Sequence, residues 1–299
     1  MDKTLGFVGV GTMGEPMARN LLKAGYEVLV TDPNPVPVAQ LVEEGATACK
    51  SVAEMASRVD VLLAALPTDA IVEQVMVGAE GVIAGGKPGL IVVDTSTVSP
   101  LTAQRISAIL ADKDIAMLEA PVSGGQVGAV AGTLAIMVGG SRDAYEQVLP
   151  VLQAIGQSIT YIGDHGSALV IKLCNNLIIG AIMTAASEAL AMAAKAGIDP
   201  GLVHEVLSGA TARGWILNEY MANTVLAGNR APGFKLALEH KDLGLALDYG
   251  KEMGVPMFVS ALVHQLYTQA QGLGKGDLDF SAIADLYSEA TGVSLERRR

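Results

Sequence analysis

The segment from Gly9 to Gly14, which reads GVGTMG, constrains the fold of this chain more than any other. It follows an apolar run, Leu5–Val10, that is typical of a buried strand, and it precedes Glu15–Ala24, a predicted helix that ends at Gly25. Between a strand and a helix, a G-x-G-x-x-G pattern is typical of dinucleotide binding. The first glycine permits a tight turn, the second lets a pyrophosphate approach the backbone, and the third lets helix and strand pack closely.

A second strand-like run, Glu27–Thr31, is followed by Asp32, 18 residues after Gly14. This spacing suits the acid that accepts hydrogen bonds from the adenosine ribose. Pro33 comes next, where an NADP-binding protein would often have arginine, so we expect NAD, with NADP possible. The predicted cofactor residues in this region are Gly9, Gly11, Thr12, Met13, Gly14 and Asp32. The alternative is an ordinary βαβ unit whose glycines only make turns.

The first half of the chain alternates apolar runs with helical stretches, which predicts a doubly wound sheet. After Gly166 no further strand-like runs occur, and Ala168–Ala196 is predicted to be one long helix. We therefore expect a Rossmann-type α/β domain over residues 1–163 and an all-helical domain over 164–299. The predicted strands are Leu5–Val10, Glu27–Thr31, Val61–Ala65, Leu90–Asp94, Ala116–Glu119, Leu134–Val138 and Ser158–Ile162. Further helices are predicted from Asp199-Pro200 onward and near Arg213–Leu226, Leu236–Met253, Val259–Gln271 and Ser281–Thr291.

The net charge of −11 disfavours nucleic acid as a partner, because its phosphates need a basic face. Cys49 and Cys174 lie far apart without metal-ligand spacing, which argues against a disulfide framework or a metal site and suits a reducing cytoplasm. No signal peptide is recognised before the first strand. Leu173–Ser187 is free of charge but shorter than the roughly 20 apolar residues of a membrane span, so we expect a buried core helix.

Lys172, Asn175 and Asn176 share one face of the long predicted helix, because they are spaced i, i+3 and i+4. That face is otherwise apolar, so a lysine and two amides there are costly unless they are satisfied. Partial burial would lower the pKa of Lys172 and suit it to proton donation. The alternative is a structural lysine that reaches back to solvent.

Two loops follow strands at the carboxyl edge of the predicted sheet, where ligands gather in open α/β folds. Asp94–Thr97 closes one strand, and Pro121–Gly125 follows the next. In the second loop Ser123 offers a hydroxyl and the paired glycines expose backbone N–H groups, an arrangement that can hold a carboxylate. Ordinary strand-to-loop turns explain both segments equally well.

Other chemically active residues give weaker signals. Lys241, in His240-Lys241-Asp242, could approach cofactor or substrate, and a solvated helix face is equally consistent. The four histidines show no metal spacing and are predicted to be structural or exposed. Cys174 has no partner that would activate it, so we expect it in the core.

Taken together, the chain resembles the β-hydroxyacid dehydrogenase family, which includes 3-hydroxyisobutyrate dehydrogenase and tartronate semialdehyde (2-hydroxy-3-oxopropionate) reductase. Four motifs match in order over nearly the whole length. FVGVGTMGEPMARN (residues 7–20) matches the cofactor loop, DTSTVSP (94–100) and EAPVSGG (119–125) match the substrate-side segments, and KLCNN (172–176) matches the catalytic helix. The combination is specific for the family and much less so for the substrate.

The resemblance implies a role for each matched residue. Lys172 would be the catalytic lysine, and Asn176, with Asn175 beside it, would orient substrate. Ser123, Gly124 and Gly125 would hold the substrate carboxylate, with Thr97 close to the nicotinamide. Leu66, Pro67 and Lys241 would line the cofactor site. It also implies a Rossmann-type domain and an all-helical domain joined by the long helix, and a homodimer or homotetramer.

The chain departs from the family pattern at a few positions. Glu119 stands where aspartate is common, and Ser167-Ala168 replaces part of a Gly-x-Gly segment. The absence of an extra loop of 3-hydroxyisobutyrate dehydrogenases favours 2-hydroxy-3-oxopropionate as substrate, whereas Arg213-Gly214-Trp215 favours the 3-hydroxyisobutyrate enzymes. A non-catalytic cofactor-binding module and an imine reductase are the alternatives, and the presence of Lys172 argues against both.

Overall fold

The structure is a computed structural model that describes residues 3–298. The chain divides into two compact units, Met1–Lys172 and Leu173–Arg299. The predicted boundary between residues 163 and 164 stays a prediction, since the long helix α9 (Ser167–Lys195) begins in the first unit and continues through the second. The first unit is α/β and the second is helical, as the sequence indicated.

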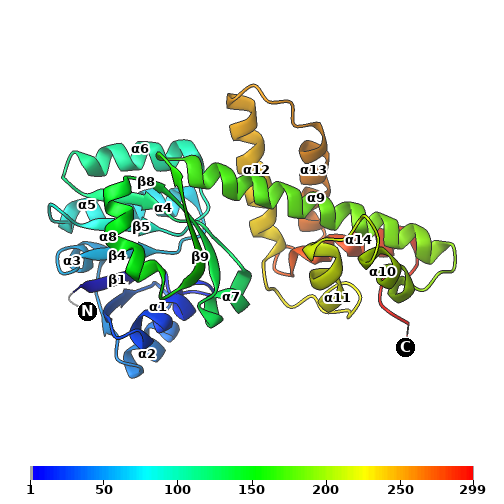
Figure 1. Ribbon diagram of the computed structural model, residues 1–299, viewed down its shortest axis with the longest axis horizontal. Coiled ribbons are helices and arrows are strands. Elements are labelled where there is room, and N and C mark those ends of the chain that lie inside the picture. The colour runs from blue at the N-terminus through cyan, green and yellow to red at the C-terminus, as the bar shows by residue number, and fades with distance from the viewer. Residues whose placement is uncertain (1–2, 299) are drawn as a thin grey trace. The chain divides into compact units, whose positions relative to one another are not determined.

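Within residues 3–298, the first unit is built on a nine-stranded sheet in the order β3-β2-β1-β4-β5-β6-β8-β7, with β9 on β8 (Figure 1). The strands from β3 to β6 are parallel, and β8 runs antiparallel to β6 and β7. The strands are β1 (Thr4–Val8), β2 (Glu27–Thr31), β3 (Thr47–Ala48), β4 (Val61–Ala64), β5 (Ile91–Asp94), β6 (Ala116–Glu119), β7 (Val122–Ser123), β8 (Leu134–Gly140) and β9 (Gly156–Gly163).

Helices pack on both faces of this sheet, so the parallel strands are buried on both sides. In β4, Val61 and Leu63 face one hydrophobic cluster while Leu62 and Ala64 face another. This alternation explains why the strands are continuous apolar runs. The helices are α1 (Gly14–Lys23), α2 (Pro35–Glu43), α3 (Val52–Ala56), α4 (Asp69–Val77), α5 (Val82–Gly85), α6 (Pro100–Ala111), α7 (Gly125–Ala131) and α8 (Arg142–Leu152). Helices α1, α2 and α8 contribute to the first cluster, and α3, α4, α5 and α6 contribute to the second.

All seven strands predicted from the sequence are present; β2 and β6 have the predicted bounds, and the ends of the others differ by at most two residues. The sequence missed β3 and β7, because two-residue strands are too short to show a period of two.

The second unit consists of the greater part of α9 and the helices that follow it. These are α10 (Pro200–Ser208), the π-helix η1 (Ile216–Tyr220), α11 (Met221–Asn223), α12 (Leu236–Glu252), α13 (Phe258–Gly272), the 3-10 turn η2 (Phe280–Ile283) and α14 (Ala284–Thr291). Its core is a single cluster in which Met183 and Leu190 of α9 meet Leu243 and Tyr267.

Helix α9 is long and apolar enough to cross a membrane by length and composition. However, Leu169 belongs to a core cluster of the first unit, and Met183, Leu190 and Ala194 belong to the core of the second. The helix therefore contributes residues to both cores, but only 39% of its most apolar stretch is buried, so the prediction of a buried core helix is confirmed in part.

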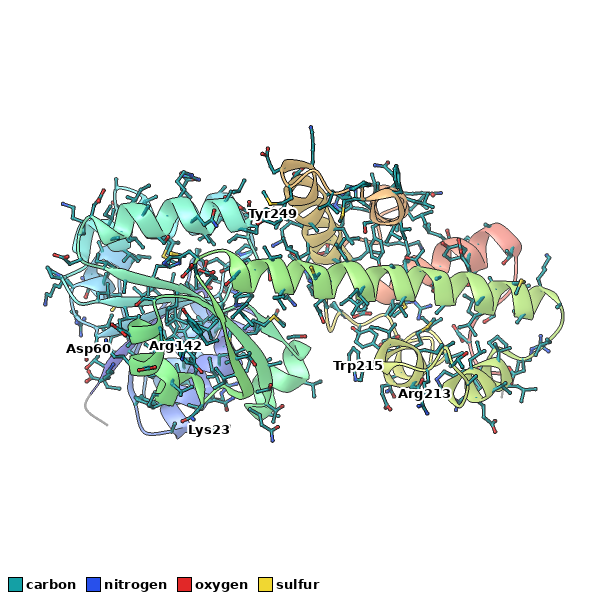
Figure 2. All side chains as sticks on the ribbon, turned by 45° about the horizontal axis from the view of Figure 1, so that its top comes forward. Lys23, Asp60, Arg142, Arg213, Trp215 and Tyr249 are labelled. Carbon is teal, nitrogen blue, oxygen red and sulfur yellow. The ribbon has the colours of Figure 1, made fainter. Side chains whose placement is uncertain are left out.

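The helical stretch predicted near Arg213–Leu226 is present over residues 215–223, but most of it is π-helical. Figure 2 labels Arg213 and Trp215 on this segment, where a π-helical turn leads into only three α-helical residues. Side chains compete here with regular helical hydrogen bonding, because the Asn218 amide donates to Ser208 O and accepts from Gly214 N–H. The predicted burial of Cys174 was wrong, since its side chain is exposed on α9.

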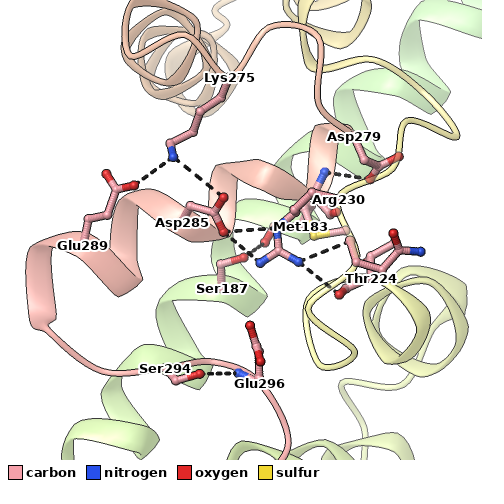
Figure 3. Close-up of polar contacts among 12 residues, drawn as sticks. Met183, Ser187, Thr224, Arg230, Lys275, Asp279, Asp285, Glu289, Ser294 and Glu296 are labelled. Atoms are coloured by element: carbon pink, nitrogen blue, oxygen red, sulfur yellow. Dashed lines mark hydrogen bonds and ion pairs between the residues drawn. The ribbon is translucent and has the colours of Figure 1, made fainter.

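A polar network attaches the loop that precedes α12 to helix α14 (Figure 3). The Arg230 guanidinium donates to Asp285 Oδ1 at 2.8 Å and to Thr224 O at 3.0 Å. Lys275 Nζ lies 2.8 Å from Glu289 Oε1 and 3.7 Å from Asp285 Oδ2. These contacts, of which the Arg230–Asp285 pair is partly buried, hold together segments that are distant in sequence.

Candidate active site

The glycine turn joins β1 to α1 and has the shape that the motif predicts. Gly9 has φ +83°, a conformation that favours glycine. A Cβ at Gly14 would lie 1.9 Å from Gly9 O, so the third glycine is required for the helix to pack on the turn. A Cβ at Gly11 would meet nothing within 4 Å, which leaves the space beside that backbone open. Together with the exposed Thr12 and the half-buried Met13, this turn fits a dinucleotide pyrophosphate at the start of α1.

Asp32 lies beside this turn, at the end of β2. Its Oδ2 accepts the Val10 N–H at 2.9 Å and its Oδ1 accepts the Asn34 N–H at 2.7 Å. The carboxylate is thereby held against the backbone of the glycine turn. Each carboxylate oxygen keeps a further lone pair for a ribose hydroxyl.

Replacing Asp32 by alanine should weaken NAD binding and strengthen NADP binding relative to it, because the charge that repels a 2′-phosphate is removed. We expect the ratio of the two dissociation constants to change at least about tenfold, or ~1.4 kcal/mol. Fluorescence titration of the two reduced cofactors measures this ratio. Asp32→Asn is the matched control for charge, and an unchanged ratio in both variants would show that Asp32 does not contact the ribose.

The ends of β4 and β5 meet at the carboxyl edge of the sheet. The Leu66 N–H donates to Ser96 Oγ at 2.8 Å, and Thr95 Oγ1 donates to Ala64 O at 2.7 Å. The buried Asp94 accepts the Ser96 N–H at 3.0 Å. These bonds order the segments that carry Leu66, Pro67 and Thr97, three residues that the resemblance assigns to the cofactor end of the site.

The proposed carboxylate-binding loop, Pro121–Gly125, comes just after β6 in the chain. Ser123 pairs with Ala135 as part of β7, so its position is set by the antiparallel ladder to β8. Gly124 and Gly125 have φ +129° and +61°, a backbone path that other residues rarely adopt. This conformation turns the chain into α7 directly after Ser123.

A chain of polar groups crosses from α9 to α12 inside the helical unit. Asn176 is fully buried, and its Nδ2 donates to Asp242 Oδ2 at 2.6 Å. Asn175 Nδ2 donates to Asn176 Oδ1 at 3.0 Å, and Lys241 Nζ lies 3.1 Å from Asp242 Oδ1. These contacts fix the carboxamide of Asn176, one helical turn beyond Lys172, which is itself 9% exposed.

Asp242 is a candidate site residue that the sequence reasoning missed. It is 2% exposed and lies on the buried face of α12 with Glu239, Leu243 and Ala246. The signal was present in the sequence, because residues 239, 242, 243 and 246 share one helix face and two of them are acidic. A buried carboxylate needs partners, and here Asn176 and Lys241 supply them.

The histidines are predicted to be structural or exposed, and three of them make contacts within the helical unit. His204 is buried, and its Nε2 lies 3.0 Å from Leu217 O. The rings of His240 and His264 stack at 4.3 Å, and burial lowers the pKa of both. Within residues 3–298 no group of three His, Cys, Asp or Glu side chains is placed to hold a metal ion.

The mostly parallel sheet with its glycine turn defines a Rossmann-type dinucleotide-binding unit, and an all-helical unit follows it. Residues 4–163 match the model described as the NAD binding domain of 6-phosphogluconate dehydrogenase. Residues 166–287 match the model described as NAD-binding of NADP-dependent 3-hydroxyisobutyrate dehydrogenase. The chain belongs to the β-hydroxyacid dehydrogenase family and is an oxidoreductase with an NAD(P)-binding Rossmann domain.

Similar proteins carry several substrate names. The chain is 40% identical to a 2-(hydroxymethyl)glutarate dehydrogenase of Eubacterium barkeri, over 99% of both proteins. It is 36% identical to the 2-hydroxy-3-oxopropionate reductase of Escherichia coli, over 93% of this chain and 95% of that one. The crystal structure of a 3-hydroxyisobutyrate dehydrogenase from Salmonella typhimurium has a TM-score of 0.86 at 36% identity, covering 95% of this chain and all of that one. The family is thus shared while the named substrates differ.

Proposed function

We propose that this protein interconverts a small aldehyde acid and the corresponding β-hydroxy acid with NAD, and that 2-hydroxy-3-oxopropionate is its substrate. The observation that carries the proposed reaction is the polar chain from Asn175 through Asn176 to Asp242, one turn from Lys172. Fixing an amide in an apolar helix core is costly, and it is useful where a substrate must be oriented beside a lysine. The proposed substrate rests on the absence of the extra loop of 3-hydroxyisobutyrate dehydrogenases.

Lys172 is the proposed general acid. During reduction, negative charge develops on the substrate carbonyl oxygen, and the Lys172 ammonium stabilises that charge and donates a proton to the oxygen. During oxidation the neutral amine takes the hydroxyl proton. The bound nicotinamide supplies or accepts the hydride at its C4.

The other residues position the two reactants. Ser123 and the N–H groups of Gly124 and Gly125 are proposed to hold the substrate carboxylate, and Asn176 to orient the reacting carbon beside Lys172. Gly11, Asp32 and the start of α1 are proposed to hold the adenosine diphosphate half of the cofactor. Leu66, Pro67, Thr97 and Lys241 are proposed to hold its nicotinamide end.

Two other substrates are supported by specific observations. The relative from Eubacterium barkeri favours a branched dicarboxylic acid such as 2-(hydroxymethyl)glutarate. The Arg213-Gly214-Trp215 segment resembles a stretch found in some 3-hydroxyisobutyrate dehydrogenases and so favours 3-hydroxyisobutyrate.

Initial rates of NADH oxidation with a panel of aldehyde acids, and of NAD reduction with the matching hydroxy acids, test the proposal. We expect kcat/KM to be highest for 2-hydroxy-3-oxopropionate, at least about tenfold above the other two candidates. A higher kcat/KM for either competitor would reassign the substrate within the family. No turnover of any member by cofactor-loaded protein would favour a binding module instead.

We also propose that the chain works in the cytoplasm as a homodimer or homotetramer. Helix α9 exposes Ile178, Ile182 and Met192, at 58%, 41% and 73%, a large apolar surface for one helix face. Sedimentation equilibrium measures the assembled mass, and a monomer at micromolar concentration would contradict this proposal.

A further inference from the structure

Glu119 connects the strand before the carboxylate-binding loop to the start of the helix that carries Lys172. It is the last residue of β6 and is 1% exposed. Its Oε1 accepts the backbone N–H of Gly166, the residue before α9. Its Oε2 lies 3.1 Å from His165 Nδ1. One buried carboxylate therefore binds two consecutive residues at the helix entry.

The surrounding backbone is shaped to admit this carboxylate. A Cβ at Gly139 of β8 would lie 2.2 Å from Glu119 Oε1, and a Cβ at Gly140 would lie 2.8 Å from His165 Cε1. Two consecutive glycines in the strand thus leave room for the Glu119 and His165 side chains. Burying a glutamate is costly unless it is hydrogen-bonded, so this arrangement differs from an incidental contact at the surface.

Further bonds hold the same turn in place. Gln104 Nε2 of α6 donates to His165 O at 2.9 Å, and Ser167 Oγ donates to Asp164 O at 2.6 Å. Gly166 has φ +94°, a conformation that favours glycine. A negative charge at this end of α9 also complements the helix dipole.

We propose that Glu119 is a positioning residue that fixes the start of α9 and so places Lys172 relative to the loop containing Ser123. This rests on the proposed function, in which Lys172 and Ser123 act on one substrate. Ser123 follows Glu119 by four residues and Lys172 follows Gly166 by six, so the Glu119–Gly166 bond is a short link between the two segments. A displacement of about 1 Å at a reacting group can cost about 10²-fold in rate.

The test compares two side chains of similar length. Glu119→Gln keeps an oxygen that accepts the Gly166 N–H, whereas Glu119→Met fills the space without an acceptor. We expect kcat of the Gln variant to stay within about threefold of wild type and kcat of the Met variant to fall by about 10–10²-fold. The NADH dissociation constant should change less than about twofold in both, because the glycine turn lies on other strands.

Gly139→Ala provides a second variant if the Met variant does not fold. Its Cβ displaces the Glu119 carboxylate while Glu119 itself is kept, so we expect the same fall in kcat with unchanged NADH affinity.

Asp60→Leu is the matched control. Asp60, labelled in Figure 2, is exposed, and its Oδ2 accepts the Thr4 N–H at 2.9 Å at the amino end of the sheet. The Asp60→Leu variant should have a lower Tm and an unchanged kcat.

Hydrogen exchange of residues 166–172 gives a readout that does not depend on turnover. We expect exchange at least about tenfold faster than wild type in the Met variant and unchanged in the Gln variant. A folded Met variant with wild-type kcat and exchange would overturn the proposal, as would equal losses in the Gln and Met variants. If wild type turned over no aldehyde acid, the proposed function would fail, while the exchange data would still decide the role of Glu119.

Discussion

Replacing Lys172 by alanine is expected to lower kcat by at least about 10²-fold and to leave the NADH dissociation constant within about a factor of two. The proposed proton donor is lost, and general acid catalysis typically contributes about 10²–10⁴-fold. The cofactor-binding turn is unaffected, since it belongs to β1 and α1. Single-turnover oxidation of bound NADH, followed at its absorbance band, separates the chemical step from binding.

Lys195→Ala is the control for this experiment, because Lys195 lies on the same helix and its exposed Nζ donates to Thr291 O at 2.7 Å. That variant should retain wild-type kcat. A Lys172→Ala protein with near-normal single-turnover rates would remove Lys172 from the mechanism and leave Asn176 and Lys241 as the polar groups to test.

Gly11→Ala and Gly14→Ala are both expected to weaken NADH binding, but for different physical reasons. At Gly11 the added methyl group meets no protein atom within 4 Å, so the protein should fold with an unchanged Tm. The methyl group then occupies space proposed for the pyrophosphate, and we expect the NADH dissociation constant to rise at least about tenfold, or ~1.4 kcal/mol.

At Gly14 the methyl group would lie 1.9 Å from Gly9 O and 2.9 Å from Phe7 Cε1, so the backbone itself must shift. Overpacking of this kind costs about 1–3 kcal/mol, and we expect a lower Tm together with weaker cofactor binding. Thermal denaturation with and without NADH distinguishes the two cases. A Gly11→Ala protein with wild-type NADH affinity would contradict the assignment of this turn to the cofactor.

Regular elements with a clear period were predictable from the sequence. The parallel strands are buried on both faces and are therefore continuous apolar runs, and Ala168–Ala196 differs from α9 by one residue at each end. Caps with local chemistry were also predictable, since Ser51 Oγ accepts the Glu54 N–H at 3.1 Å and Ser141 Oγ accepts the Ala144 N–H at 3.4 Å. Ser99 makes no such bond, although it is the residue before α6 and Pro100 begins that helix.

Irregular elements were less predictable, because contacts from distant segments decide them. The segment after Arg213 is apolar enough for an α-helix, but the Asn218 amide binds Ser208 O and the Tyr220 hydroxyl donates to Asp279 at 2.7 Å. Cys174 lies on an apolar helix between buried residues, yet its rotation about the helix axis leaves it exposed. The sequence could not predict which face of this helix is buried, because the helix is apolar on nearly all sides.

The sequence by itself determined the Rossmann-type unit, the helical unit, the family and the glycine turn, because each depends on local spacing along the chain. Only the tertiary structure decided that Asp242 holds Asn176 and that Glu119 holds the entry to the helix of Lys172. These pairs join residues 66 and 47 positions apart, and a hydrogen bond at that separation depends on how strands and helices pack rather than on any local pattern.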